Sequence, residues 1–354
     1  MTPSPARPRP IGQVPFPSAD FWHLAPRPAK SRVGFKEWSH FSVLGGDFDL
    51  LVNFSVMTES EGASPRSTPR LTLLVRAPDG HWDGDVEVFN RVDTTILPGL
   101  PDAVFGRNSA RFIGPHYRVE AELSSRAVSA ALDLHPMTQP VIANQSRLSD
   151  AESFSWMVVS HLRAEGELNV SARRYRITDA PAYHDRNWGC FMWGGSYAWE
   201  WAIILPPEAL QPWCLVYSRF RDVHRGATRS QSLLLWRREF LCRKFYGRDL
   251  SISHRGLLRR ERVLRLPRIA SLLMPGVAAD VPQEILVSAR GYGDELDLRM
   301  SFDDFAQVVV PNDRWPGFTL LCEIQGRAEV TARIGGERIA FEGRVQAELN
   351  HVSR

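Results

Sequence analysis

The feature that most constrains this chain is the alternation of apolar and polar residues along many short segments separated by turn-forming residues. Phe48 to Met57 alternates in this way, and similar segments recur as far as Arg338 to Glu348. A period of two puts successive side chains on opposite faces of a strand, and Gly, Pro, Asn and Asp between the segments favour turns. A helical pattern is found mainly in Leu257 to Leu273, where Pro267 would interrupt a helix. We therefore predict an all-β antiparallel fold with few short helices.

An internal repeat divides the chain into two similar halves. The matches lie 163, 163 and 160 residues apart. They are Trp38 with Trp201, Phe54-Ser55 with Tyr217-Ser218, and Gly166 to Arg173 with Gly326 to Arg333. A duplicated unit of about 160 residues has the usual size of a β-barrel with its loops. We predict a disordered Pro-rich lead-in over residues 1–30, an N-terminal barrel over 31–192 and a C-terminal barrel over 193–354.

Composition excludes several classes of protein. The net charge of +3 is small for 354 residues, whereas nucleic-acid-binding domains are usually strongly basic. No apolar run approaches the roughly 20 residues that cross a bilayer, and the Pro-rich start lacks the apolar core of a secretory signal. The four cysteines form no C-x-x-C pair, so we expect reduced thiols in a cytoplasmic protein. The oligomeric state stays open.

The segment Tyr183 to Gly189 interrupts the β pattern and concentrates chemically active side chains. Phenol, imidazole, carboxylate, guanidinium, amide and indole groups follow one another without a gap. A carboxylate at Asp185 that faces an aromatic cavity beside Tyr183 would lose its hydration, so its pKa would rise and it could act as an acid. The alternative is a structural corner between the barrels, with Asp185 paired to Arg174 or Arg186.

This segment also carries a family resemblance. Tyr183 to Gly189, followed by Trp199-Glu200-Trp201, resembles the carotenoid 1,2-hydratase (hydroxyneurosporene synthase) or AttH-like superfamily, whose signature is a Y-x-D-x-N-x-G box and a W-x-W strand. The likeness extends over residues 35–350. It implies two tandem lipocalin-like barrels. Relatives protonate a terminal prenyl alkene and let water trap the cation, and similar folds serve cofactor-free fungal Diels–Alderases.

The resemblance also implies roles for individual residues. Asp185 would be the proton donor, Tyr183 its hydrogen-bonding partner, and Asn187 would help to set its geometry. The family's upstream histidine has no clear counterpart, and His161 is the nearest candidate, with Trp156 as the neighbouring aromatic residue. The residues expected to contact substrate are Glu37, Trp38, Trp156, His161, His184, Trp188, Trp199, Glu200 and Trp201.

We therefore expect an enzyme without cofactor or metal, either a hydratase or a cyclase, that acts on an apolar terpenoid, polyene or polyketide in secondary metabolism. Nucleotide-binding glycine motifs, the G-x-S-x-G motif and H-E-x-x-H are all absent from the sequence. A carrier that only binds a hydrophobic small molecule is the first alternative, and a scaffold protein with filled barrels is the second. An empty or ligand-sized pocket in either barrel would exclude the scaffold.

One basic segment allows a further partner. Arg237 to Arg268 holds eleven Lys or Arg and three acidic residues, with apolar residues between the charges. Such a surface could meet anionic lipid at the place where an apolar substrate enters. The solvated face of ordinary strands fits the same composition and is the interpretation that we favour.

Overall fold

The computed structural model describes residues 18–23, 34–58, 67–195, 197–207, 211–274 and 279–353. The first half of the chain forms one sheet of twelve strands. These are β1 (Phe35–Leu44), β2 (Asp49–Thr58), β3 (Ser67–Arg76), β4 (Trp82–Val88), β5 (Thr94–Ile96), β6 (Ala103–Phe105), β7 (Asn108–Ile113), β8 (His116–Glu122), β9 (Val128–Pro136), β10 (Val141–Arg147), β11 (Ser153–Val170) and β12 (Arg173–Cys190).

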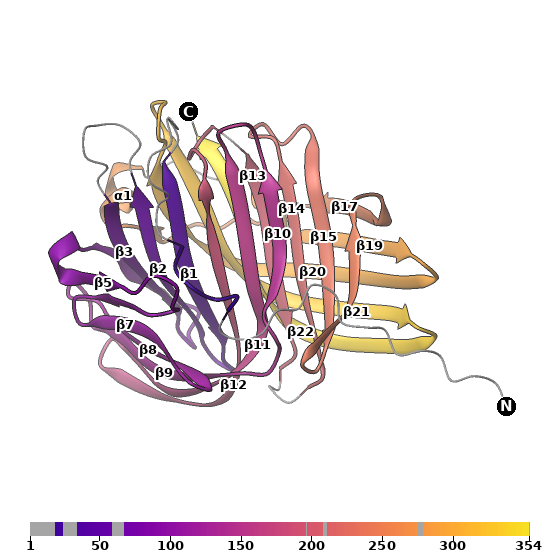
Figure 1. Ribbon diagram of the computed structural model, residues 1–354, viewed down its shortest axis with the longest axis horizontal. Coiled ribbons are helices and arrows are strands. Elements are labelled where there is room, and N and C mark those ends of the chain that lie inside the picture. Colours follow the sequence, from indigo (N-terminus) through magenta and orange to yellow (C-terminus); the bar gives the residue numbers. More distant parts are fainter. Residues whose placement is uncertain are drawn as a thin grey trace.

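The second half forms a sheet of ten strands. These are β13 (Ala198–Leu205), β14 (Trp213–Arg221), β15 (Thr228–Arg237), β16 (Phe240–Tyr246), β17 (Leu250–Arg255), β18 (Arg265–Leu266), β19 (Glu284–Gly291), β20 (Asp294–Pro311), β21 (Phe318–Ile334) and β22 (Glu337–Ser353). The described helices are α1 (Ile269–Leu273) and two single 3₁₀ turns, Arg91–Asp93 and Gly247–Asp249. Figure 1 shows the first sheet in indigo to magenta and the second in orange to yellow.

The two sheets share one connectivity, which confirms the predicted all-β fold of two tandem lipocalin-like barrels. In the first, β12 lies between β1 and β11, and in the second, β22 lies between β13 and β21. The described pairings between these strands are antiparallel except for β18, which runs parallel to β20, and a single parallel bridge joins Trp22 to Pro98. The helical pattern predicted for residues 257–273 is reduced to α1, because Pro267 lies directly after β18.

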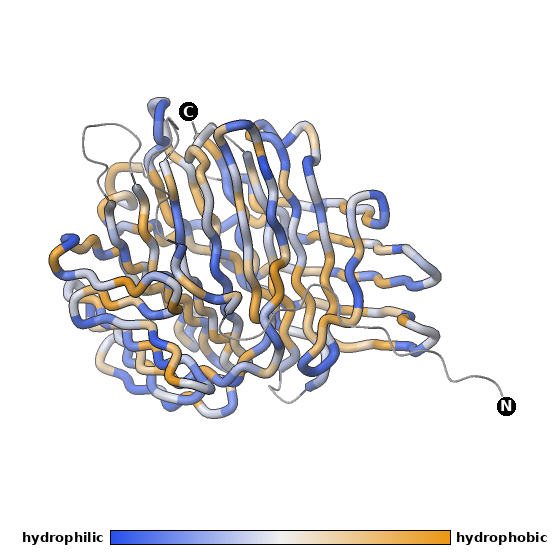
Figure 2. The backbone as a smooth tube through the Cα atoms, viewed as in Figure 1, coloured by the Kyte–Doolittle hydropathy of each residue, from blue (hydrophilic) through white to orange (hydrophobic). Residues whose placement is uncertain are grey.

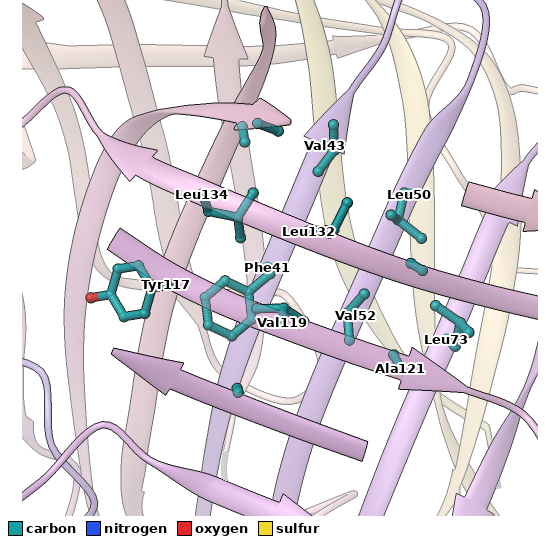
Figure 3. Packing of buried hydrophobic residues seen from close by; sticks show 14 of the residues in the cluster. Phe41, Val43, Leu50, Val52, Leu73, Tyr117, Val119, Ala121, Leu132 and Leu134 are labelled. Atoms are coloured by element: carbon teal, nitrogen blue, oxygen red, sulfur yellow. The ribbon is translucent and has the colours of Figure 1, made fainter. Parts of the chain in front are cut away.

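Each curled sheet encloses an apolar core, and a third core joins the two sheets. In the first barrel, Phe41 and Val43 of β1 meet Val119 of β8 and Leu132 of β9 (Figure 3). The third core contains Tyr183 and is rich in aromatic side chains from both sheets. Polar residues gather at the hairpin tips, which Figure 2 shows in blue. The outer faces of the two sheets therefore pack together along a seam, and strand alternation decides which side chains reach it.

Part of the predicted disordered lead-in is ordered. Asp20 and Trp22 are buried, and Trp22 Nε1 donates a hydrogen bond to the Pro101 carbonyl at 3.0 Å. The expectation of disorder is therefore wrong for residues 18–23, because an indole and a carboxylate in this short segment find buried partners. The remainder of residues 1–30 lies outside the described residues.

Two expectations concern the environment of the chain. No helix in the described parts of the chain has the length and hydropathy needed to cross a membrane. All four cysteines are free thiols. Cys214 and Cys322 are buried, whereas Cys190 and Cys242 are only partly so.

Candidate functional site at the seam

The signature segment lies within strand β12 and does not interrupt the β structure. Its even and odd positions therefore face opposite sides. Tyr183 belongs to the aromatic core of the seam, whereas His184 stacks on Phe41 inside the first barrel with ring centroids 4.3 Å apart. Asp185 and Asn187 line a small chamber at the seam. The expectation that this segment interrupts the β structure or forms a corner between the barrels is wrong, because its residues pair with both β1 and β11 as a continuous strand.

Asp185 is held entirely by neutral hydrogen-bond donors. Its Oδ2 accepts hydrogen bonds from the Tyr183 hydroxyl at 2.8 Å and from Trp156 Nε1 at 3.0 Å. Its Oδ1 accepts a hydrogen bond from Asn187 Nδ2 at 2.7 Å. The side chain is nearly fully buried, with 5% of its surface exposed.

No arginine compensates this carboxyl group in the described structure. Arg186 points to the other face of β12 and pairs with Asp20, and Arg174 pairs with Glu167 near the hairpin end. The predicted ion pair of Asp185 with either arginine is therefore wrong. Strand alternation turns Arg186 away, and Arg174 lies near the opposite end of the strand.

Burial dominates the electrostatics of Asp185. Loss of hydration raises the pKa of Asp185 to about 7, and the nearby Glu348 carboxyl adds to the rise. The hydrogen bonds from Tyr183, Trp156 and Asn187 oppose this shift because they stabilise the ionised form. At neutral pH the group therefore exists in both forms, as a general acid requires.

Two cavities meet beside this carboxyl group. The Asp185 chamber has a volume of about 40 Å³, enough for a water or for the end of a chain. The neighbouring cavity measures about 360 Å³ and lies between the outer faces of β2 to β4 and strands β20 to β22. Trp38, Trp199 and Glu348 line both spaces. A ligand in the larger cavity would therefore lie next to the Asp185 chamber.

The larger cavity opens beside α1. Ile269 and Leu273 of this helix line it and are still 57% and 73% exposed. Arg268, which precedes the helix, is tied to the first sheet by a hydrogen bond from its backbone NH to Asp85 Oδ1 at 3.1 Å. The apolar opening formed by α1 is therefore bonded to the first sheet although α1 belongs to the second half of the chain, and Figure 1 shows α1 next to β3.

The structure brings together only part of the predicted substrate contacts. Five of them line the Asp185 chamber, namely Trp38, Trp156, Trp199, Glu200 and Trp201. The other four are absent from the lining of both cavities. These are Glu37, His161, His184 and Trp188.

The physical reason for three of these absences is strand alternation. Glu37 Oε1 accepts a hydrogen bond from the His23 backbone, and Trp188 stacks on the His23 ring with centroids 3.9 Å apart. His184 Nε2 contacts Asp20 Oδ2 at 3.0 Å inside the first barrel. His161 is buried on β11, and burial lowers its pKa to about 4.

Sequence reasoning missed His40, the histidine that does line the Asp185 chamber. His40 is the register partner of Asp185 across β1 and β12. Its Nε2 lies 2.7 Å from the Ser42 hydroxyl, and burial lowers its pKa to about 3, so the ring is neutral. The available signal was its position two residues after Trp38, which puts both side chains on one face of the strand.

Two carboxyl groups from the second sheet were also missed. Glu348 lines both cavities, and its register partner Glu323 lines the larger one. The signal was again alternation. Glu348 lies between the core residues Ala347 and Leu349, in a strand whose other face must therefore be polar.

The part of the chain that the structure describes contains no group of three or more His, Cys, Asp or Glu side chains placed to hold a metal ion. Comparisons of the sequence with family models and with curated proteins find no match. Comparisons of the structure do find matches.

An AttH-type protein from Nitrosomonas europaea superposes with a TM-score of 0.65 and 14% identity, over 99% of this chain and 100% of that one. Kievitone hydratase from Nectria haematococca gives a TM-score of 0.55 at 13% identity, with 98% of each chain covered. CghA in complex with Sch210972 gives 0.60 at 14% identity, over 98% of this chain and 96% of that one. The chain shares their fold. The resemblance seen in the signature segment is thus confirmed at the level of the fold.

Proposed function

We propose that this protein is a cofactor-independent hydratase or cyclase that acts on an apolar terpenoid, polyene or polyketide substrate in secondary metabolism. The observation that carries the proposal is a buried carboxyl group, Asp185, without a cationic partner in the described residues, beside a cavity of about 360 Å³ that opens at α1. The fold shared with a protein named as a hydratase supports the same kind of chemistry.

The protonation step uses Oδ1 of Asp185, the oxygen that accepts one hydrogen bond where Oδ2 accepts two. Oδ2 already accepts two hydrogen bonds, so the transferable proton belongs on Oδ1, where a rotated Asn187 amide can present its oxygen to it. The proton and the alkene π electrons form a new C–H bond, which leaves a tertiary cation and the Asp185 carboxylate. A water molecule adds to the cation through oxygen, and its surplus proton returns to Asp185.

The aromatic walls and the chamber assist this sequence. Indole faces such as those of Trp38 and Trp199 stabilise a cation through their electron-rich rings. The cavity fixes the chain in one folded arrangement, which supplies rate through orientation. If a second alkene captures the cation in place of water, the product is a ring. A concerted cyclisation would need the shape of the cavity alone.

A carrier of a hydrophobic small molecule is the second candidate. The small volume of the Asp185 chamber favours it, because about 40 Å³ admits only the tip of a substrate to the carboxyl group. Binding in the larger cavity would proceed without contact to Asp185.

The test is product analysis with native mass spectrometry on the wild type and Asp185→Asn, each incubated with prenylated and polyene lipids. Glu337→Gln, in an exposed ion pair, serves as the control. Binding by both proteins with conversion by the wild type alone supports the acid. Equal conversion by both contradicts the acid and favours a concerted cyclisation. Binding without conversion in either protein favours the carrier.

A further inference from the structure

The larger cavity is lined by a pair of carboxyl groups that the proposed proton transfer from Asp185 does not use. Glu323 of β21 and Glu348 of β22 are direct partners in the antiparallel register. Both line the 360 Å³ cavity, and Glu348 also borders the Asp185 chamber. The pair therefore lies between the space for the substrate chain and the proposed acid.

These carboxyl groups have few partners. Glu323 is 3% exposed, and its Oε2 has no hydrogen-bond partner. Glu348 is partly accessible, as expected for a side chain that borders two cavities, and its Oε1 accepts a hydrogen bond from Trp199 Nε1. Within the described residues, no lysine, arginine or histidine forms a salt bridge with either carboxyl group.

Carboxyl groups of register partners lie on neighbouring strands and repel each other when both are charged, and no salt bridge within the described residues offsets that repulsion here. Burial raises the pKa of Glu323 well above its usual range, and the neighbouring Glu348 raises it further. Burial also raises the pKa of Glu348, while hydrogen bonds from Glu323 and Trp199 oppose that rise. The raised pKa values therefore favour a form of the pair that keeps a proton, and the greater burial of Glu323 favours this residue as its holder.

A second polar pair lies next to the first along the same strands. Gln325 and Gln346 are register partners, 3% and 1% exposed. Gln325 Oε1 lacks a hydrogen-bond partner, and the Gln346 amide lies beside Glu323, where it opposes the rise of that group's pKa. Buried polar atoms are almost always paired, because an unpaired one costs about 1–3 kcal/mol. Four polar side chains thus gather on these two strands, and Glu323 and Glu348 are the two that line the cavity. The facing wall from the first sheet adds Asn53, Ser55, Arg70 and Thr72, and the rest of the lining is mainly apolar.

We propose that Glu323 and Glu348 share a proton and together hydrogen-bond a neutral oxygen, a hydroxyl or a carbonyl, on an otherwise apolar substrate. The inference rests on the proposed function, because the cavity that the pair lines must be the one that holds the substrate. The apolar walls bind the chain, and the pair fixes which part of it faces Asp185. A ligand that places a carboxylate against the pair is disfavoured, because it would bring a further negative charge beside Glu323 and Glu348, whereas Arg70 lines the facing wall.

The experiment measures equilibrium binding of farnesol, farnesene and farnesoic acid by calorimetry. These probes present a hydroxyl, a plain hydrocarbon and a carboxylate on similar chains. We expect the wild type to bind farnesol about tenfold more tightly than farnesene, the effect of one well-placed hydrogen bond. Glu323→Met should abolish that preference and leave farnesene binding nearly unchanged. Glu323→Gln should keep it and strengthen the binding of farnesoic acid.

A matched control comes from the same two strands. Glu329 and Glu342 are also register partners, but both are exposed, so Glu329→Met should bind all three probes like the wild type. Equal binding of farnesol and farnesene by the wild type would overturn the inference. The inference would also be overturned if Glu323→Met and Glu323→Gln both lost affinity for farnesol and for farnesene to the same extent. A failure of all three probes to bind the wild type would overturn it as well.

Asp185→Asn separates this inference from the proposed function. It should retain the preference for farnesol while losing conversion of any substrate that the wild type converts. If Asp185→Asn converts substrate normally and Glu323→Met still loses its preference, the acid is refuted and the oxygen-binding pair stands. If Glu323→Met still prefers farnesol to farnesene, the oxygen-binding role of the pair is refuted, whether or not Asp185 is the acid.

Discussion

At the scale of the residue, the two oxygens of Asp185 are in different environments. Oδ2 accepts hydrogen bonds from a phenol and an indole, and Oδ1 faces a single amide that can rotate. Three donors would hold the pKa of an exposed carboxyl low, yet burial outweighs them and brings the pKa of Asp185 to about 7. The side chain thus keeps a fixed position and a transferable proton together.

Asp185→Asn should change how stability depends on pH. The folded-state pKa of about 7 exceeds the unfolded value of about 3.8, so the wild type loses stability as pH rises between these values. The variant has no such group. The difference between the free energies of unfolding, variant minus wild type, should therefore be about 3 kcal/mol larger at pH 8 than at pH 5. Urea denaturation at both pH values measures this, and a pH-independent difference would contradict it.

Tyr183→Phe should shift the acid in a defined direction. The phenol donates to Asp185 Oδ2 and stabilises the carboxylate, so its loss should raise the pKa of Asp185 by about one to two units. The alkaline limb of the pH–rate profile should move upward by the same amount. A downward shift, or none, would show that the phenol does not contribute to the protonation equilibrium.

At the scale of the element, Gly189 lets β12 pass close to β11. A Cβ atom there would overlap the backbone of Ser153 and Phe154, whereas one at the exposed Gly46 would touch nothing. We expect Gly189→Ala to lower the free energy of unfolding by about 1–3 kcal/mol and Gly46→Ala to change it little. Chemical denaturation compares them. Equal effects would show that the close approach is not required.

Part of β12 could be predicted from its own sequence. In an extended segment, alternation puts Tyr183 and Asp185 on one face and His184 on the other, as the structure shows, although we expected the segment to interrupt the β pattern and expected His184 to contact substrate. Cross-strand partners could not be predicted in this way, because register between distant segments depends on the packing of the whole sheet. His40 and Glu323 were missed for that reason, as one lies far before the signature segment and the other far after it.

At the scale of the whole molecule, two curled sheets pack back to back, and the site lies between them. Neither barrel alone forms the larger cavity, since Asn53 of β2 and Leu321 of β21 line the same space. The repeated architecture was predictable from the duplicated pattern. The place of the cavity was not, because it depends on how the two outer faces meet.

The N-terminal segment stabilises the first barrel through Asp20. Its carboxylate accepts hydrogen bonds from the Tyr117 hydroxyl at 2.7 Å and from Arg186 Nε at 2.5 Å, and it contacts His184. Asp20→Ala removes the nearest carboxylate from the buried Arg186 and leaves it only the more distant Glu37, at 4.0 Å, so we expect a loss of about 3 kcal/mol in the free energy of unfolding. Glu337→Ala, in an exposed pair, should cost under about 1 kcal/mol. Similar losses in the two variants would contradict this role of Asp20.

The most direct test of the central claim is the titration of Asp185 itself. Carboxyl ¹³C NMR spectra of the wild type, recorded from pH 3 to pH 9 and assigned by comparison with Asp185→Asn, report the protonation of this side chain. We expect a midpoint near pH 7 for the resonance that the variant lacks. A midpoint near 4 would mean that Asp185 is fully ionised at neutral pH and cannot serve as the acid.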